Sequence, residues 1–251
     1  MAFFDFQGKK IFYKEYGKGA PLLLLHGNSL SSAMFTSAAE ELQKHYKVIL
    51  MDFLGNGKSD RINRISKDLW YDEALQAIAL MEYRNYPQVY LLGSSGGALA
   101  ALNVALERPD MVKKVVADSF EGEYPLDSFA ANLRQDRELS KQNPWLRDLY
   151  MKNHGTDWET VVDNDTQAIC RHYQTHRSFF HKSLCELETP VLMTGSREDE
   201  FMPADFFEKT YGQIPLPNKT IHIFEKGGHP AILSNQEAFI PVVLEFFRED
   251  L

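Results

Sequence analysis

The fold is decided by the stretch Val89-Tyr-Leu-Leu-Gly93-Ser-Ser95-Gly-Gly97, which continues directly into Ala98-Leu-Ala-Ala-Leu-Asn-Val-Ala105. A short apolar run of strand-forming residues enters Gly-x-Ser-x-Gly, and an alanine-rich run typical of a helix leaves it. In the order strand, tight turn, helix, this motif holds a serine hydroxyl exposed above a sheet. The turn forces its central residue into a strained backbone conformation, and the flanking glycines leave room for it. The candidate nucleophile is therefore Ser95.

The same stretch allows two other interpretations, a turn without a chemical role and a nucleophile at Ser94. Gly-x-Ser-x-Gly can be a glycine-softened turn whose serine has no chemical role. The strand before the motif and the helix after it favour the catalytic interpretation. The neighbouring Ser94 has Gly96 two residues after it but Leu92 two residues before it, so it does not fit the motif.

Length and charge narrow the class of protein. A chain of 251 residues suits one large α/β domain, or such a domain with an insertion. The formal net charge of −8 argues against a nucleic acid or an anionic membrane as partner, and it says nothing about a small substrate.

The sequence predicts a cytoplasmic protein. Its first ten residues lack the basic start, apolar core and small-residue cleavage site of a signal peptide. No apolar run approaches the roughly 20 residues that a membrane-spanning helix needs. The two cysteines, Cys170 and Cys185, are too few for a disulfide framework and suit a reducing compartment.

Predicted strands and helices alternate along most of the chain, which is typical of a mostly parallel, doubly wound sheet. The run Pro21-Leu-Leu-Leu-Leu-His26 is continuously apolar, as expected of a strand buried on both faces. Besides the strand that begins at Val89, the predicted strands are 3–6, 10–16, 21–26, 47–52, 111–118, 189–195 and 219–224. The predicted helices are 33–45, with Ser31 or Ser32 as cap, 67–83, with Ser66 as cap, 203–211 and 235–249.

The alternation lapses between positions 119 and 187. This stretch is polar and rich in aromatic residues, and Ile169, Tyr173, His176 and Phe180 lie three or four apart, which predicts an amphipathic helix. We interpret it as an insertion folded over the carboxyl edge of the sheet, where such sheets bind ligands.

These features together resemble the α/β-hydrolase fold family, in which Gly-x-Ser-x-Gly is the nucleophile elbow. The resemblance covers nearly the whole chain except the insertion. It implies an α/β-hydrolase core formed by 1–118 and 188–251, with 119–187 as a helical cap or lid. It also implies a catalytic triad in the chain order serine, acid, histidine.

The histidine expected from this resemblance is His229, in the stretch Glu225-Lys-Gly-Gly-His229-Pro-Ala-Ile. The loop after the last strand would let its imidazole lie over Ser95 and accept the hydroxyl proton. A solvated loop histidine is the plain alternative. Position favours His229, because His222 lies within a predicted strand and the other histidines are early or in the insertion.

The acid is expected in Gly195-Ser-Arg-Glu198-Asp199-Glu200-Phe-Met-Pro203. The family often places the acid three residues after this glycine, which names Glu198. It also often places a proline four residues after the acid, which names Asp199. We expect Asp199, because the proline begins the next helix and fixes the end of the loop. Glu198 stays the alternative, and Asp118 is a third candidate.

The resemblance also implies two N–H donors for a tetrahedral oxyanion. One is the backbone N–H of Gly96, directly after the nucleophile. The other comes from the loop His26-Gly27-Asn28, for which we expect Asn28, with Ser29 as the alternative.

No metal site and no cofactor are expected. His172 and His176 have the i, i+4 spacing of helical zinc ligands. A third ligand at suitable spacing is not evident in the sequence, so we interpret them as pocket-lining or surface histidines.

The leading functional hypothesis is a serine hydrolase that cleaves an ester-like bond of a small molecule through an acyl-enzyme on Ser95. Amide cleavage, carbon–carbon hydrolysis and acyl transfer use similar frameworks. A ligand-binding receptor that keeps the triad but turns over little is the alternative from another class. A serine nucleophile argues against aspartate-dependent relatives such as haloalkane dehalogenases and epoxide hydrolases.

Overall fold

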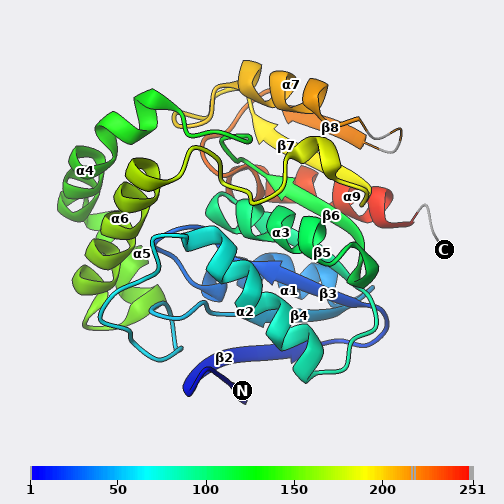
Figure 1. The fold of residues 1–251 in the computed structure, drawn as a ribbon, viewed down its shortest axis with the longest axis horizontal. Coiled ribbons are helices and arrows are strands. Elements are labelled where there is room, and N and C mark those ends of the chain that lie inside the picture. Colours follow the sequence, from blue (N-terminus) through cyan, green and yellow to red (C-terminus); the bar gives the residue numbers. More distant parts are fainter. Residues whose placement is uncertain (1, 216, 218, 249–251) are drawn as a thin grey trace.

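The computed structural model describes residues 2–215, 217 and 219–248. Their centre is an eight-stranded sheet in the order β1-β2-β4-β3-β5-β6-β7-β8 (Figure 1). Only the β1–β2 and β2–β4 pairs are antiparallel, and the remaining pairs are parallel. The strands are β1 (Ala2–Phe6), β2 (Lys9–Tyr16), β3 (Pro21–Leu25), β4 (Lys47–Met51), β5 (Val89–Ser94), β6 (Val112–Asp118), β7 (Val191–Ser196) and β8 (Lys219–Phe224).

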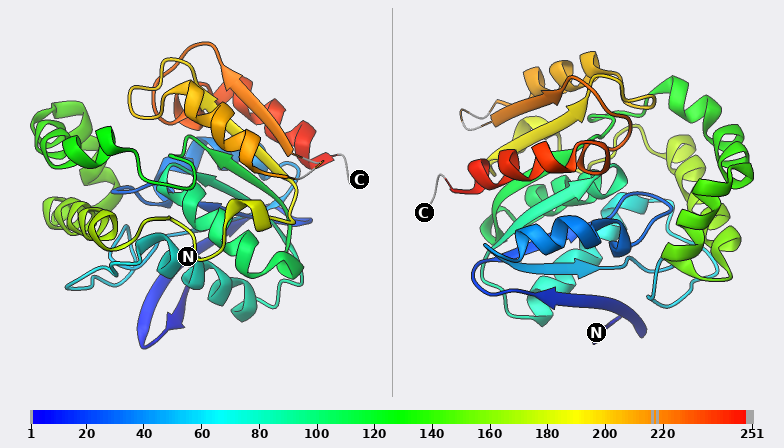
Figure 2. Two further views of the ribbon diagram at one scale, coloured as in Figure 1. Left: turned by 45° about the horizontal axis from the view of Figure 1, so that its top comes forward. Right: turned by 180° about the vertical axis from the view of Figure 1, so that it is seen from behind.

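Helices cover both faces of this sheet, because alternate residues of each central strand point to opposite sides. Leu23 and Leu25 of β3 pack with α2 (Leu69–Tyr83) and α3 (Gly96–Glu107). The intervening Leu22 and Leu24 pack with α1 (Thr36–Leu42) and α9 (Gln236–Arg248) on the other face (Figure 2). The remaining core helices are α7 (Ala204–Gln213) and α8 (Ala231–Ser234). The predicted mostly parallel, doubly wound α/β sheet is confirmed.

Helix boundaries differ from the predictions by a few residues. The predicted helix 33–45 is a 3₁₀ turn, Ser32–Phe35, followed by α1, and the Ser31 hydroxyl accepts a hydrogen bond from the Ala33 N–H. The prediction that Ser66 caps α2 is wrong. Its hydroxyl accepts from the Asp68 N–H, one residue before the helix begins, because the chain makes one more turn first. Position 249 of the predicted last helix lies outside the described residues.

Between β6 and β7 the chain forms α4 (Asp127–Gln142), α5 (Pro144–His154) and α6 (Trp158–Thr175). These helices contact one another and lie together at one side of the sheet (Figures 1 and 2). The predicted amphipathic helix corresponds to α6, but it ends before His176, whose backbone is extended. Within the described ranges, no helix is long and apolar enough to cross a membrane.

Candidate active site

The turn between β5 and α3 has the strained geometry that the sequence predicts. Ser95 has φ 56° and ψ −126°, a conformation that non-glycine residues rarely adopt. An added Cβ on Gly93 would lie 2.1 Å from the carbonyl oxygen of Gly97, and one on Gly97 would lie 2.1 Å from that of Leu25. Glycine is therefore required at both positions, since a side chain at position 93 would meet the start of α3 and one at position 97 would meet the end of β3.

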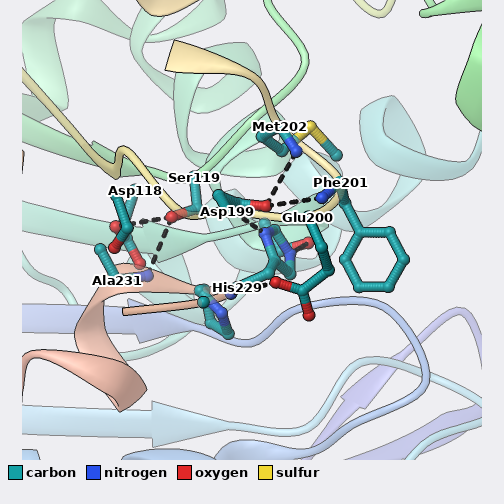
Figure 3. A network of polar contacts seen from close by, with 12 residues as sticks. Asp118, Ser119, Asp199, Glu200, Phe201, Met202, His229 and Ala231 are labelled. Atoms are coloured by element: carbon teal, nitrogen blue, oxygen red, sulfur yellow. Dashed lines mark hydrogen bonds and ion pairs between the residues drawn. The ribbon is translucent and has the colours of Figure 1, made fainter. Parts of the chain in front are cut away.

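A chain of hydrogen bonds joins three of the predicted site residues. The Oγ atom of Ser95 lies 2.9 Å from Nε2 of His229, and Nδ1 of His229 lies 2.8 Å from Oδ2 of Asp199. The other carboxylate oxygen of Asp199 accepts hydrogen bonds from the N–H groups of Phe201 and Met202 (Figure 3). When Nδ1 carries the proton and donates a hydrogen bond to Asp199, Nε2 has a free lone pair that can accept a hydrogen bond from the Ser95 hydroxyl.

The two glutamates beside Asp199 have different partners. Glu198 accepts a hydrogen bond from the N–H of Gly227, and Glu200 accepts one from the backbone N–H of His229, each at 3.2 Å. Both carboxylates thus hold the backbone of the histidine loop. The contact with the imidazole ring that the sequence left open between Glu198 and Asp199 is made by Asp199.

Asp118, the third candidate for the acid, is fully buried at the end of β6. Its carboxylate accepts hydrogen bonds from the hydroxyls of Ser94 and Thr194 and from the N–H of Ile232. Burial raises the pKa of this carboxyl to about 6. These partners hold β5, β7 and the start of α8 together beside the elbow, which gives Asp118 a structural position.

The loop after β3 lies against the elbow. An added Cβ on Gly96 would lie 2.0 Å from Oδ1 of Asn28, so the two predicted oxyanion residues are adjacent. Gly96 begins α3, where backbone N–H groups have no carbonyl partner within the helix. The side chain of Asn28 accepts a hydrogen bond from Nε1 of Trp70. The alternative residue, Ser29, instead donates its hydroxyl proton to Asp165 of α6 at 2.5 Å.

A family model described as alpha/beta hydrolase fold matches residues 20–178. The chain belongs to this family. The match spans the elbow, the loop after β3 and most of the segment between β6 and β7, and it agrees with the sheet order described above.

Curated relatives of this α/β-hydrolase are themselves hydrolases. A proline iminopeptidase of Heyndrickxia coagulans is 28% identical, with 98% of each chain aligned. A 2-hydroxy-6-oxononadienedioate/2-hydroxy-6-oxononatrienedioate hydrolase of Pseudomonas putida is 27% identical over 95% of this chain and 92% of the relative. A solved meta-cleavage product hydrolase variant superposes with a TM-score of 0.79 at 22% identity, covering 99% of this chain and 98% of its own, and shows the same fold. The prediction of an α/β-hydrolase enzyme is confirmed.

A cavity of about 260 Å³ in this α/β-hydrolase opens at Ser95 and His229. Its other walls come from α4, α5, α8, the loop after Asp199 and the loop and 3₁₀ turn after β3, and most of the lining residues are apolar. They include Phe129, Leu133, Arg137, Trp145, Leu146, Leu149, Tyr150, Glu200, Phe201 and Leu233. The sequence did not identify the lining residues of α4 and α5, because only the packing of these helices on the core brings them to the serine.

Glu121 is a further buried acid that the sequence did not identify. Its carboxylate accepts hydrogen bonds from the hydroxyl of Tyr173, at 2.6 Å, and from the N–H of Leu126. Burial raises the pKa of this carboxyl to about 7. Glu121 also lines a small cavity of about 10 Å³ that Ser95 and Asn28 share, so its charge lies close to the candidate active site.

Proposed function

We propose that this protein is a serine hydrolase that cleaves an ester-like bond of a small molecule through an acyl-enzyme formed on Ser95. The observation that carries this proposal is the hydrogen-bonded chain from Ser95 through His229 to Asp199. A base within hydrogen-bond reach of the nucleophile, itself oriented by a third group, is the arrangement that activates a serine.

In the proposed reaction, Oγ of Ser95 attacks the substrate carbonyl while Nε2 of His229 takes the hydroxyl proton. The imidazolium then gives this proton to the departing alcohol, which leaves the acyl group on the serine. A water molecule, deprotonated by His229, attacks the acyl-enzyme; as the bond between the acyl carbon and Oγ breaks, the imidazolium returns the proton to Oγ of Ser95 and the acid is released. Throughout, Asp199 keeps the imidazole in the required tautomer and stabilises its positive charge.

The backbone N–H groups of Gly96 and Asn28 are proposed to bind the oxyanion of the tetrahedral intermediate. Their support is the adjacency of the two residues beside Ser95 and the free N–H groups at the start of α3. Each such donor contributes about 3 kcal/mol of barrier lowering in comparable sites.

We also propose that 119–187 acts as a cap that forms the acyl-binding wall. Support comes from the cavity, whose lining joins Ser95 and His229 of the core to Leu133 of α4 and Tyr150 of α5. A volume of about 260 Å³ lies just below the roughly 300–1,000 Å³ of drug-sized sites. We therefore expect short or medium acyl groups to be preferred over long ones.

The test is a set of p-nitrophenyl esters of increasing acyl length, assayed with the protein and two serine variants. We expect multiple turnovers, a maximum at short or medium chains, and a loss on the order of 10⁶ in kcat for Ser95→Ala. Ser94→Ala is the matched control and should retain kcat within about tenfold, since it removes the hydrogen bond of the Ser94 hydroxyl to Asp118 and does not alter Ser95.

A serine-directed phosphonate should label Ser95, as located by mass spectrometry of the digested protein. An adduct elsewhere would overturn the assignment of the nucleophile. At most one slow turnover on every ester would favour the receptor alternative.

One observation favours a second candidate, the cleavage of an amide beside a free amine. Glu200 lines the cavity, and its carboxylate lies against the His229 loop, where it could bind a protonated amine. A proline iminopeptidase is among the relatives. Faster turnover of prolyl p-nitroanilide than of any ester, lost in Glu200→Gln, would make this the main activity.

A further inference from the structure

A second polar cluster lies outside the candidate active site, where the start of α2 meets the end of α6. Asp68 directly precedes α2, His172 lies on α6, and His176 directly follows that helix. One oxygen or nitrogen atom from each of these side chains lies within 4.8 Å of the others. The sequence showed only the pair of histidines; the fold adds a carboxylate from far earlier in the chain.

The two imidazoles of this cluster have incomplete hydrogen bonding. Nε2 of His176 is buried and has no hydrogen-bond partner among the described residues. In His172, Nδ1 and Nε2 each lie 3.2 Å from a carbonyl oxygen, of Lys67 and of Ser178. In its neutral form the imidazole of His172 carries one proton, on one of these two nitrogens. One of its nitrogens therefore has a lone pair facing a carbonyl oxygen.

The carboxylate of Asp68 is oriented by a residue that does not belong to the cluster. Oδ2 of Asp68 lies 2.6 Å from Nε2 of His181, whose ring stacks on Tyr71 with centroids 3.6 Å apart. Metal-binding carboxylates usually have such a hydrogen-bonded outer partner, which orients the ligating oxygen.

We propose that Asp68, His172 and His176 bind one zinc ion. Two imidazoles and one carboxylate form a donor set that zinc commonly takes, and nitrogen ligands disfavour magnesium and calcium. Ligands at about 2 Å from a tetrahedral ion lie roughly 3.3 Å apart, so the ligand atoms must approach one another by at most about 1.5 Å. The partly exposed ring of His176, which stacks on His172 with centroids 4.7 Å apart, rotates out of this stack to do so, while Asp68 keeps its hydrogen bond to His181. A water molecule completes the four ligands.

A bound ion would join the core to the inserted helices beside the active site. The ring of His172 packs against Trp70 with centroids 4.7 Å apart, and Trp70 donates its N–H to Asn28. The ion would therefore steady α2, the end of α6 and the loop that holds Asn28.

The test uses the full chain, treated with a chelator, freed of it and titrated with Zn²⁺ alone in a calorimeter. We expect one equivalent to bind with a dissociation constant at or below about 1 μM. At a free Zn²⁺ concentration one hundred times this constant, the melting temperature should rise by on the order of 5 °C. Co²⁺ in place of Zn²⁺ should give the visible absorption of a four-coordinate site.

Two substitutions at the cluster edge test the assignment without emptying the core. Asp68→Asn and His176→Ala should each weaken Zn²⁺ binding by about a hundredfold. His45→Ala is the matched control, because His45 is an exposed histidine outside the cluster, and it should bind Zn²⁺ like the unaltered protein.

Weak or absent Zn²⁺ binding by the unaltered protein overturns the proposal. So does tight binding that both cluster variants retain. The hydrolase proposal stands or falls separately, because Ser95→Ala should bind Zn²⁺ normally while losing turnover.

Discussion

The elbow and the inserted helices acquire their positions in different ways. At the elbow, Ser95 is fixed by glycines within two residues of it and by the strand and helix that flank it. The inserted helices are fixed by contacts with distant parts of the chain. Asn153 of α5 accepts hydrogen bonds from Ser31, and Asp165 of α6 accepts one from Ser29, across 122 and 136 positions.

This difference suggests a division of roles. Ser95, Asp199 and His229 lie directly after β5 and in the loops after β7 and β8 of the core. The inserted helices supply cavity walls and are joined to the core by individual polar contacts and by apolar side chains such as Leu133 and Ile169. Changes in the core site should therefore lower kcat, whereas changes at the contacts of the insertion should lower stability and raise KM.

After the loss expected for Ser95→Ala, the largest effect is expected at the acid. Asp199→Asn should lower kcat by on the order of 10⁴, because the amide holds the wrong tautomer of His229. Glu198→Gln should lower kcat by less than about tenfold, since the hydrogen bond of Glu198 within the described part of the chain goes to the backbone N–H of Gly227 and not to the imidazole of His229. Steady-state kinetics of both variants, with the ester that the unaltered protein cleaves fastest, distinguish Asp199 from Glu198. A large loss of kcat in Glu198→Gln would identify Glu198 as the acid instead. A small loss in both variants would point to Asp118.

The next effect concerns the close approach of α3 to β3. Gly97→Ala should destabilise the protein by at least about 4 kcal/mol, because the new methyl group meets the carbonyl oxygen of Leu25. Gly212→Ala is the matched control in α7, where an added Cβ meets nothing within 4 Å. It should be neutral or stabilise by up to about 1 kcal/mol in urea unfolding. Equal free energies of unfolding for the two variants would contradict the requirement for glycine at position 97.

A third prediction concerns Glu121, whose pKa burial raises from 4.5 to about 7. Between these values the folded state binds more protons than the unfolded state, so the free energy of unfolding falls as pH rises. The fall amounts to about 3 kcal/mol and is complete above pH 7. Glu121→Gln should abolish this fall in the free energy of unfolding, as measured by urea unfolding between pH 4.5 and 7.5.

Tyr173→Phe sharpens this test. The Tyr173 hydroxyl bonds to the carboxylate and lowers the pKa of Glu121, so its loss should extend the fall in stability to higher pH. A slope that both variants share with the unaltered protein would show that Glu121 does not titrate in this range.

The smallest effect is expected at the contact of the insertion with the core. Asn153→Ala leaves the buried N–H of Ser31 without a partner, which should cost about 2 kcal/mol. KM should rise because α5 lines the cavity, while kcat changes less than about threefold. The exposed neighbour Lys152 provides the control, and Lys152→Ala should stay within about 0.5 kcal/mol. A loss confined to kcat would contradict the division of roles.

The sequence predicted the sheet and the elbow because both depend on neighbouring residues. Continuous apolar runs mark strands buried on both faces, and glycine spacing marks the turn at Ser95. The resemblance added His229 and left Glu198 and Asp199 open, because adjacent loop residues point in directions that only a structure gives. The boundary of α2 was predicted two residues early, since Ser66 caps a turn rather than the helix.

The cavity lining and the cluster around His172 could not be predicted. Phe129 and Tyr150 reach the cavity only through the packing of α4 and α5 on the core. Asp68 joins the histidines only because α2 meets the end of α6. Such contacts have no local pattern in the sequence, since they depend on tertiary packing.

The inserted segment leaves the sheet after β6 and returns to it at β7, and these two strands are neighbours. Evolution can therefore lengthen, shorten or replace the segment without changing strand register or the chain that links the serine to its base. Under the proposed function, exchange of this one module would change the substrate while Ser95, His229 and Asp199 stay in place. Chimeras that carry the module of another family member would be a practical route to altered specificity.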